Sequence, residues 1–310
     1  MSLDQRRFVF VTGKGGVGKT TVTAAMATAL AARGKRVLIA MSGAHERLSS
    51  MLGHPAIGHD VVPLGTNIWA TLIDANRAMQ EYGELVIKVR AIARLVFENR
   101  YTHGFFRAAP GLHDWALLGK AWWHTTELLQ GQPRYDIVLF DAPATGHGLD
   151  MLRVPKVILD VVPPGILRRD AEQAWELFHD ASKSGVVVVS LPEDMPVTES
   201  IELVTALRSE LEFPLERVVI NAIFPNLFDE AERLALTADS ALFEAARRGQ
   251  HMAPPEAALA AGVRRAARED IQARNIERLR NAIGGETTLL PFLLGTAGTP
   301  AGIRELSRHF

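Results

Sequence analysis

Glycines, two lysines and a threonine cluster near the start of the chain at a spacing that suits phosphate binding. The segment reads Gly13-Lys14-Gly15-Gly16-Val17-Gly18-Lys19-Thr20 and is followed by Thr21. In such a loop the glycines let backbone N–H groups point at phosphate oxygens, the lysine before the threonine reaches the β and γ phosphates, and the hydroxyl holds Mg²⁺. We therefore predict ATP or ADP and Mg²⁺ as cofactors, with Lys19 on the phosphates and Thr20 on the metal.

The elements around this loop support the same interpretation. A strand is predicted at Phe8–Thr12, a helix at Thr20–Arg33, and Gly34 stands where a helix C-cap is expected. The positive N-terminal end of that helix would face the phosphates. The residues predicted to line the cofactor here are Gly13, Gly15, Gly16, Val17, Gly18, Lys19, Thr20 and Thr21. The alternative, a glycine turn that only joins a strand to a helix, would not call for a Lys-Thr pair.

A second group of candidate residues follows another apolar run. Asp141 comes directly after Asp136–Phe140, so its carboxylate is expected at the carboxyl edge of a parallel sheet, beside the loop. We predict that Thr20 and Asp141 form the metal site, with capping of the next turn as the alternative for Asp141. Gly146 is predicted to offer its N–H to the γ phosphate and to move when that phosphate leaves. His147 beside it either relays this motion or is a hydrogen-bonded loop residue.

Short apolar runs typical of strands alternate with longer helical patterns along the chain. The predicted strands are Arg7–Thr12, Arg36–Met41, Ile68–Ile73, Tyr135–Phe140, Val186–Ser190 and Arg217–Ile220. This alternation predicts an α/β fold with a doubly wound, mostly parallel sheet, as in P-loop NTPases. We expect one P-loop domain over residues 1–310, with a helical insertion at 75–133 that contains no strand, and a helix-rich tail at 229–281 interrupted at Pro254-Pro255.

Several segments together resemble the arsenical-pump and tail-anchored-protein-targeting ATPase family, whose P-loop is of the deviant Walker-A class. They are Asn67–Asp74, Ala109–Leu112, Asp141–His147, which is similar to the family's second switch, Leu191–Glu199 and Val218–Asn221. The resemblance implies an ATP-hydrolysing homodimer or heterodimer in which Lys14 reaches the partner's nucleotide and Asn221 contacts adenine. The alternative for Lys14 is a solvated surface lysine, and the alternative for Asn221 is an asparagine that turns the chain after a strand. We interpret Glu193 and Glu199 as helix-start residues.

The first switch departs from that family. Its usual Asp-Pro-Ala-His is replaced by Ser42-Gly43-Ala44-His45. A serine can hold a water by hydrogen bonds, but it cannot act as a carboxylate base near neutral pH. Hydrolysis is therefore expected to be slow while nucleotide binding is nearly intact. Glu46 is the nearest carboxylate, but it stands four residues after Ser42, so its side chain reaches a point several ångströms away and is not expected to replace the missing aspartate. The predicted catalytic residues are Lys14, Lys19, Ser42, Asp141 and Gly146.

The features that would handle a cargo also differ. The chain has no cysteine, which excludes a thiolate arsenite site and the family's bridging Cys-x-x-Cys zinc site. The family's groove for a membrane helix favours methionine, and the insertion contains only Met79. An apolar stripe is interpreted as the core of the insertion, with a client groove as the alternative; it comprises Leu85, Val89, Ile92, Val96, Trp115 and Trp122. Histidines 103, 113 and 124 lack the spacing of metal ligands.

Charge and hydropathy exclude further classes of protein. The chain has 34 Lys plus Arg against 35 Asp plus Glu, so a nucleic-acid partner is not expected. No run reaches the roughly 18 apolar residues of a membrane span, and the N-terminal residues lack a signal-peptide pattern, so a cytoplasmic protein is expected. Residues 299–310 are too short and too weakly basic for the stable membrane anchor of a Min- or Par-like positioning switch.

Two functions remain from these observations. The first is a dimeric molecular switch that binds ATP, hydrolyses it slowly and couples the nucleotide state to the handling of a protein client. The second is a nucleotide-binding regulatory or scaffold subunit with little hydrolysis, paired with a related active chain. The P-loop and Lys14 favour the first, and Ser42 favours the second.

Overall fold

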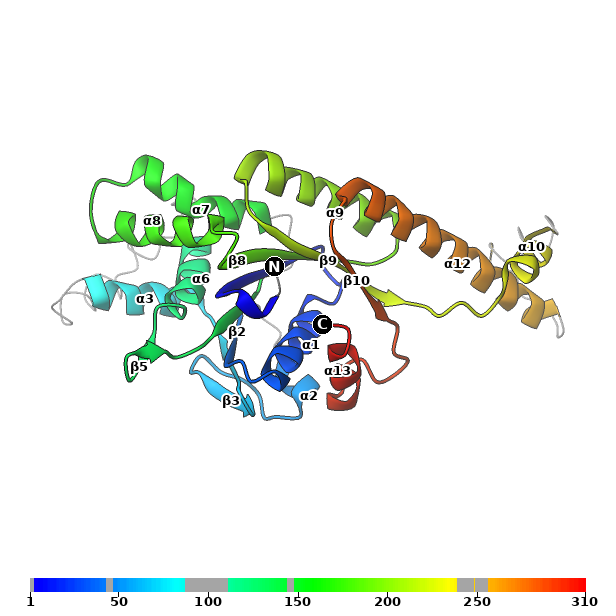
Figure 1. Ribbon diagram of the computed structural model, residues 1–310, viewed down its shortest axis with the longest axis horizontal. Helices are drawn as coiled ribbons and strands as arrows, with labels where there is room; N and C mark the ends of the chain where they lie inside the picture. The colour runs from blue at the N-terminus through cyan, green and yellow to red at the C-terminus, as the bar shows by residue number, and fades with distance from the viewer. Residues whose placement is uncertain (1–2, 43–46, 87–110, 144–147, 239–247, 249–255) are drawn as a thin grey trace.

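The computed structural model describes residues 3–42, 47–86, 111–143, 148–238, 248 and 256–310 (Figure 1). In these ranges the centre of the molecule is an eight-stranded sheet with the order β10-β9-β8-β1-β7-β2-β4-β3. Neighbouring strands pair in parallel except β3, which runs antiparallel to β4. The strands are β1 Phe8–Thr12, β2 Val37–Met41, β3 Val62–Gly65, β4 Ile68–Leu72, β7 Ile137–Asp141, β8 Ser184–Ser190, β9 Leu215–Ile223 and β10 Thr287–Pro291. The predicted mostly parallel α/β fold is confirmed.

Helices cover both faces of this sheet. Figure 1 shows α7, α8, α9 and α12 on one face and α1, α2 and α13 on the other. The helices are α1 Lys19–Ala32, α2 Leu48–Leu52, α3 Ala75–Val86, α6 Leu112–Trp123, α7 Gly148–Val161, α8 Ile166–His179, α9 Asp194–Ala206, α10 Glu230–Ala238, α12 Glu256–Ile283 and α13 Pro300–Ser307, with short helical turns at Leu3–Gln5 and Leu207–Leu211. No helix in the described ranges is both long and apolar enough to span a membrane.

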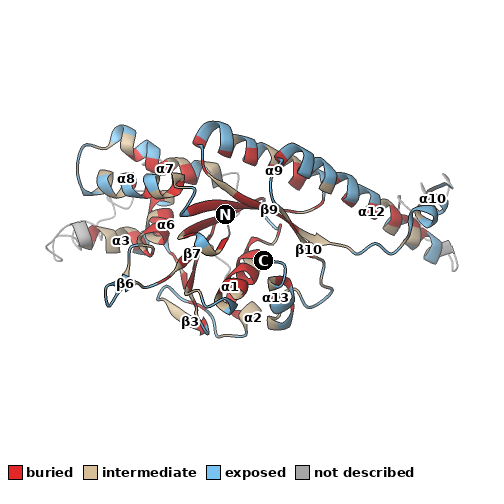
Figure 2. Ribbon diagram, viewed as in Figure 1, coloured by how far each residue is buried: buried red, intermediate tan, exposed pale blue. Residues whose placement is uncertain are grey.

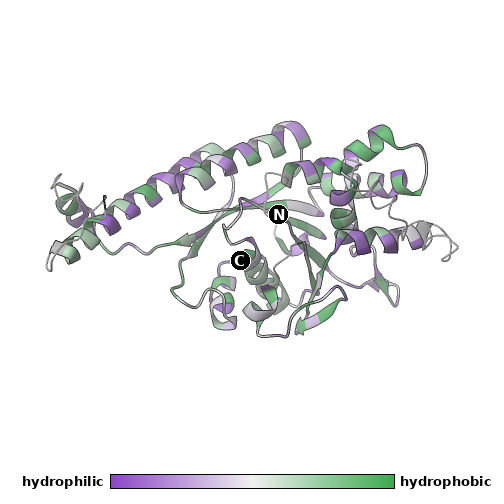
Figure 3. Ribbon diagram, turned by 180° about the vertical axis from the view of Figure 1, so that it is seen from behind, coloured by the Kyte–Doolittle hydropathy of each residue, from purple (hydrophilic) through white to green (hydrophobic). Residues whose placement is uncertain are grey.

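The two layers follow from the alternation of side chains along each strand. In β1, Phe8 and Phe10 belong to the core beneath α6 to α9, whereas Val9 and Val11 belong to the core against α1, α2 and α13. Burial on both faces explains why the strands are continuous apolar runs. The central strands β1, β2, β7 and β8 are accordingly buried along their whole length (Figure 2), and hydrophobic residues gather in the sheet (Figure 3).

The long helix α12 extends from the sheet to α10 (Figure 1) and packs against α9 and α10. It forms the predicted tail together with α10. The segment around Pro254-Pro255 lies outside the described residues.

Three features depart from the expected elements. The strands β3 and β10 were not predicted, because each is a short edge strand with no long apolar run. The insertion was expected to contain no strand, and this was wrong: β5 Leu128–Leu129 pairs with β6 Gln132–Pro133. Two-residue strands with exposed leucines carry no detectable pattern. The boundaries 75–133 stay a prediction, since residues 87–110 lie outside the described ranges.

Candidate nucleotide-binding site

The glycine-rich loop joins β1 to α1, and its backbone fits closely between neighbouring strands. Gly13 has a φ of 144°, and a Cβ there would lie 2.2 Å from the backbone oxygen of Val189 at the end of β8. Gly18 has a φ of 92° and precedes α1, and a Cβ there would meet the amide of Asn221. Both positions therefore require glycine, because other residues rarely adopt this backbone conformation and would also clash. At the other end of α1, Gly34 has a φ of 82°, as a C-cap glycine should.

Lys19 is folded back onto its own loop. Its Nζ donates hydrogen bonds to the carbonyl oxygens of Gly13, at 3.0 Å, and Lys14, at 3.2 Å. Burial lowers the pKa of the Lys19 ammonium, and the charge of Asp141 opposes this shift. The ammonium thus lies inside the curve of the loop, where phosphate oxygens would bind.

Thr20 and Asp141 meet as the predicted metal site requires. The Thr20 hydroxyl donates to Asp141 Oδ2 at 2.6 Å. The other carboxylate oxygen, Oδ1, is buried and has no hydrogen-bond partner in the described structure. Burial raises the pKa of Asp141 to about 6, while the Thr20 hydrogen bond and the charge of Lys19 act to lower it. A hydroxyl and an unpartnered carboxylate oxygen are hard oxygen ligands, so these residues fit Mg²⁺.

These residues surround a cavity of about 300 Å³ at the carboxyl edge of the sheet. It is lined by Gly16, Gly18, Lys19, Thr20, Thr21, Met41, Ser42, Arg47, Met51, Leu72, Asp141, Ala142 and Pro143. Five of the predicted loop residues are in this set. Of the other three, Gly13 lies against β8, Gly15 is exposed, and Val17 packs its side chain into the core.

Ser42 lies at the end of β2, beside the predicted metal site. Its hydroxyl and its backbone N–H both donate to the carbonyl oxygen of Asp141, each at 3.2 Å, and the residue is buried. The hydroxyl is therefore tied to β7, and its remaining capacity toward a water is that of an acceptor. The rest of the first switch, Gly43–Glu46, and the second-switch residues Thr145, Gly146 and His147 lie outside the described residues.

Lys14 and Glu199 form an ion pair. Lys14 Nζ lies 2.6 Å from Glu199 Oε1, and both side chains are partly exposed. Glu199 is in the second turn of α9, so the expectation of a purely helix-start role misses this contact. The alternative of a solvated surface lysine stays open, because the side chain is partly exposed although it is paired. The predicted role of Lys14 toward a partner's nucleotide stays a prediction.

Asn221 lies within β9 and contacts the P-loop directly. Its Nδ2 donates to the carbonyl oxygen of Val17 at 2.9 Å. The residue that takes up a left-handed backbone conformation is the next one, Ala222, with a φ of 57°. Asn221 therefore supports the loop and does not itself turn the chain. Its contact with adenine stays a prediction.

The cavity residues that the sequence interpretation did not name as site residues include Arg47 and Met51. Arg47 directly precedes α2, and Met51 within α2 accepts a weak contact from the Thr21 hydroxyl, at 4.0 Å. Arg47 comes soon after the altered first switch, and a charged residue at that place could have indicated a site residue. Elsewhere, His113 is exposed on α6 and His124 is buried beside Glu127, and the described residues contain no group of three or more potential metal-ligating side chains.

Comparison with known proteins identifies the lineage of this site. The sequence pattern of the anion-transporting ATPases matches residues 6–163, just over half of the chain, including the P-loop, Ser42 and Asp141. The chain belongs to the anion-transporting ATPase family. The family is one of nucleotide-binding ATPases, and the P-loop cavity is the candidate nucleotide site.

Individual relatives agree with this membership. The chain is 29% identical over 225 residues to ATPase BagA of Mycobacterium tuberculosis, a match that covers 71% of the chain and 66% of BagA. It is 25% identical to ATPase ARSA1 of Chlamydomonas reinhardtii, covering 71% of the chain and 35% of that protein. An ATPase ASNA1 homolog of Entamoeba dispar is 24% identical, with 71% and 77% covered. The match thus spans slightly less than two thirds of BagA.

Proposed function

We propose that this anion-transporting ATPase relative is a Mg²⁺-dependent, dimeric molecular switch that hydrolyses ATP slowly and couples its nucleotide state to a protein client. The observation that carries the proposal is the meeting of Lys19, Thr20 and Asp141 at one cavity, with an unpartnered carboxylate oxygen on Asp141. Bound Mg²⁺ would supply positive charge to the phosphate oxygens of the nucleotide.

The residues of the chain divide the work of hydrolysis. The loop N–H groups and Lys19 hold the β and γ phosphates, while Thr20 and Asp141 provide oxygen ligands for the metal. The oxygen of a water forms a bond to the γ phosphorus as the bond to the β,γ-bridging oxygen breaks. ADP leaves with that electron pair, and the water's protons pass to the released phosphate and to solvent. Ser42 can position this water only weakly, because its hydroxyl donates to Asp141 O.

The dimer is supported by Lys14. Its ammonium is paired with Glu199 of its own chain, and both side chains are partly exposed. A second copy, or a related chain, would offer a nucleotide to this lysine once the pair with Glu199 opens. The client is supported by a second cavity of about 340 Å³ between α3, α6 and α8, whose walls include Met79, Tyr82, Trp115, Trp123 and Ile166.

The test is phosphate release from Mg–ATP by the purified chain at several protein concentrations, with Lys19→Ala as the control. The proposal expects a specific rate that rises with protein concentration and is lost in the variant. A rate per molecule that is independent of concentration would contradict the dimeric mechanism. The same rate in Lys19→Ala would contradict hydrolysis at this site.

A regulatory subunit with little hydrolysis is the second candidate, and the observation that favours it is Ser42. If the missing carboxylate limits the reaction, Ser42→Asp should raise the turnover by about tenfold, within the usual range for a group that acts on the attacking water. Ser42→Ala serves as the matched control and should leave turnover low. An unchanged turnover in Ser42→Asp would contradict the explanation that Ser42 is the cause of slow hydrolysis.

A further inference from the structure

The nucleotide cavity has three cationic side chains in its surroundings, and two of them are engaged. The ammonium of Lys19 is bound to Gly13 O and Lys14 O, and that of Lys14 is paired with Glu199. Arg47 lines the cavity and is exposed, and within the described part of the chain its guanidinium makes no hydrogen bond or ion pair. An unpaired guanidinium beside an acidic metal site is a group available for an anion.

The backbone of Arg47 is nevertheless held in place. Its carbonyl oxygen accepts from the N–H of Met51 at 3.2 Å and from the hydroxyl of Ser50 at 2.9 Å. The next residue, Leu48, is fully buried in the core that contains α1 and α13. The side chain therefore starts from a fixed point at the cavity wall, while its long stem and head can adjust to a ligand.

The sheet order indicates which end of a nucleotide would reach this wall. Asn221, the predicted adenine contact, lies on β9, which is on one side of β1. Met41, Ser42 and Leu72 come from β2 and β4 at their carboxyl ends, on the other side of β1. A nucleotide with its base toward β9 and its phosphates on the P-loop would therefore direct its terminal phosphate at the cavity that Arg47 lines.

We propose that Arg47 is a catalytic residue that binds the terminal phosphate of ATP and stabilises the charge on its oxygens during hydrolysis. This inference rests on the proposed function, since it concerns the same reaction. A planar guanidinium can donate two parallel hydrogen bonds to a phosphoryl group. In phosphoryl transfer such an arginine acts on charge at the equatorial oxygens and takes no proton. It thus offers this chain a source of transition-state stabilisation that does not need the carboxylate absent at Ser42.

The experiment compares the binding of Mg–ADP with that of the Mg complex of a non-hydrolysable imido analogue of ATP. The proteins are the unaltered chain, Arg47→Ala, Arg47→Lys and a control, Arg304→Ala. Arg304 is an exposed arginine on α13 that does not line the cavity. Titration calorimetry gives both affinities, and phosphate release gives the rate for each protein.

The expected result is that Arg47→Ala binds the triphosphate analogue about 10- to 100-fold more weakly, with ADP affinity changed less than about threefold. Its hydrolysis should fall by roughly 100-fold. Arg47→Lys should recover part of the triphosphate affinity because it keeps the positive charge, but not all of it, because an ammonium cannot donate the two parallel hydrogen bonds of a guanidinium. Arg304→Ala should behave like the unaltered chain.

Three results would overturn the inference. Equal losses of ADP and triphosphate affinity in Arg47→Ala would show a general effect on the site. Unchanged affinities for both nucleotides in Arg47→Ala would show that Arg47 does not meet the terminal phosphate, while leaving the proposed function intact. Failure of the unaltered chain to bind either nucleotide would overturn the proposed function together with this inference.

Discussion

Two cavities of similar size in the described part of the chain are built in different ways. The nucleotide cavity lies where strands end, and it combines backbone, hydroxyl and charged groups around Asp141 with apolar side chains such as Met41 and Leu72. The cavity between α3, α6 and α8 is walled mainly by aromatic and aliphatic side chains, including Trp115, Trp123 and Tyr82. The first is suited to a charged ligand whose phosphates are met by fixed donors. The second is suited to apolar surface.

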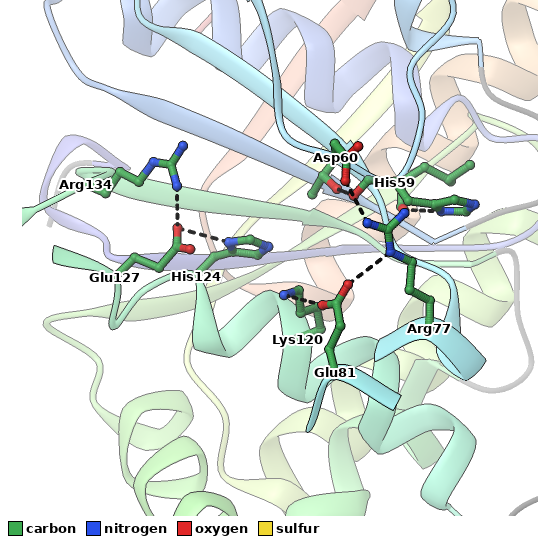
Figure 4. A network of polar contacts seen from close by, with 10 residues as sticks. His59, Asp60, Arg77, Glu81, Lys120, His124, Glu127 and Arg134 are labelled. Atoms are coloured by element: carbon green, nitrogen blue, oxygen red, sulfur yellow. Dashed lines mark hydrogen bonds and ion pairs between the residues drawn. The ribbon is translucent and has the colours of Figure 1, made fainter. Parts of the chain in front are cut away.

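The two cavities also differ in whether their charged groups have partners. Around the aromatic cavity charged groups pair with one another: Glu81 pairs with Lys120 at 2.8 Å and with Arg77 at 3.0 Å, and Asp170 pairs with Arg169 at 3.3 Å (Figure 4 shows the first two pairs). The nucleotide cavity instead keeps Asp141 Oδ1 and the Arg47 guanidinium without partners in the described residues. An unpartnered buried carboxylate oxygen needs a physical explanation, and a bound metal ion is the one that the proposed function supplies.

The polar network in Figure 4 includes contacts between the aromatic region and the segment that precedes β3. Arg77 of α3 contacts Asp60 at 2.7 Å in the segment between α2 and β3, and Glu127 contacts both His124 and Arg134. Each exposed pair contributes little to stability. The helices are held mainly by the apolar core that includes Trp115 and Leu118.

The largest expected effect is on the nucleotide side. In Gly13→Ala the new Cβ would lie 2.2 Å from Val189 O, a backbone atom that cannot move aside, so the loop must shift. We expect Mg–ADP affinity to fall at least about 100-fold, because the phosphate donors are displaced by a sizeable fraction of a hydrogen-bond length.

The matched control for that change is Gly34→Ala. Gly34 also has a positive φ, but no atom lies within 4 Å of its Cβ position. It should cost about 1 kcal/mol of stability and leave ADP affinity unchanged. Similar nucleotide binding by the two variants in calorimetry would contradict the close fit assigned to the loop.

The next effect should appear on the aromatic side and should concern stability. Trp115 is 3% exposed and packs 6.5 Å, centroid to centroid, from Trp122. Trp115→Ala should lower the free energy of unfolding by about 3 kcal/mol in urea titrations, while ADP affinity changes little. Leu128→Ala, at a leucine that is 66% exposed, is the control and should be nearly neutral. Loss of nucleotide binding in folded Trp115→Ala would show that the two cavities are not independent.

The smallest expected effect is a pH dependence from His124. Burial lowers the pKa of this imidazole below its usual 6.5, while Glu127 acts to raise it and Lys120 and Arg134 act to lower it. The unfolded chain therefore takes up a proton more readily than the folded protein below about pH 6.5, so stability is lost as pH falls through that range. Above it, the imidazole is neutral in both states and the loss is absent.

The measurement is the free energy of unfolding at about pH 7.5 and about pH 5.5, in the unaltered chain and in His124→Gln. The drop between the two pH values should be smaller in the variant. An equal drop would assign the pH dependence to other groups.

The comparison also explains which parts could be predicted from the sequence. Lys19, Thr20 and Asp141 were predicted because a phosphate loop is a continuous stretch of chain and strand ends converge at one sheet edge. The ion pair of Lys14 with Glu199 joins residues 185 positions apart, and no local pattern records it. Arg47 was missed for a related reason, since its place at the cavity depends on how β2, β4 and the P-loop come together.

For the aromatic region the sequence predicted a core and left a client groove as the alternative. Trp115, Leu118 and Trp122 follow helical spacing and are buried, as interpreted. The cavity beside them depends on how α3, α6 and α8 pack together, which side-chain spacing within one helix does not determine. The short strands β5 and β6 were not predicted for a different reason, because two residues are too few to show an alternation of apolar and polar side chains.

The most direct test of the account is a crystal structure of the chain with Mg²⁺ and a non-hydrolysable ATP analogue. The account predicts phosphates enclosed by residues 13–20, the metal beside Thr20 and Asp141, and the terminal phosphate in the cavity below Ser42 and Arg47. Nucleotide bound elsewhere, or a P-loop cavity without nucleotide at saturating concentration, would contradict the central claim.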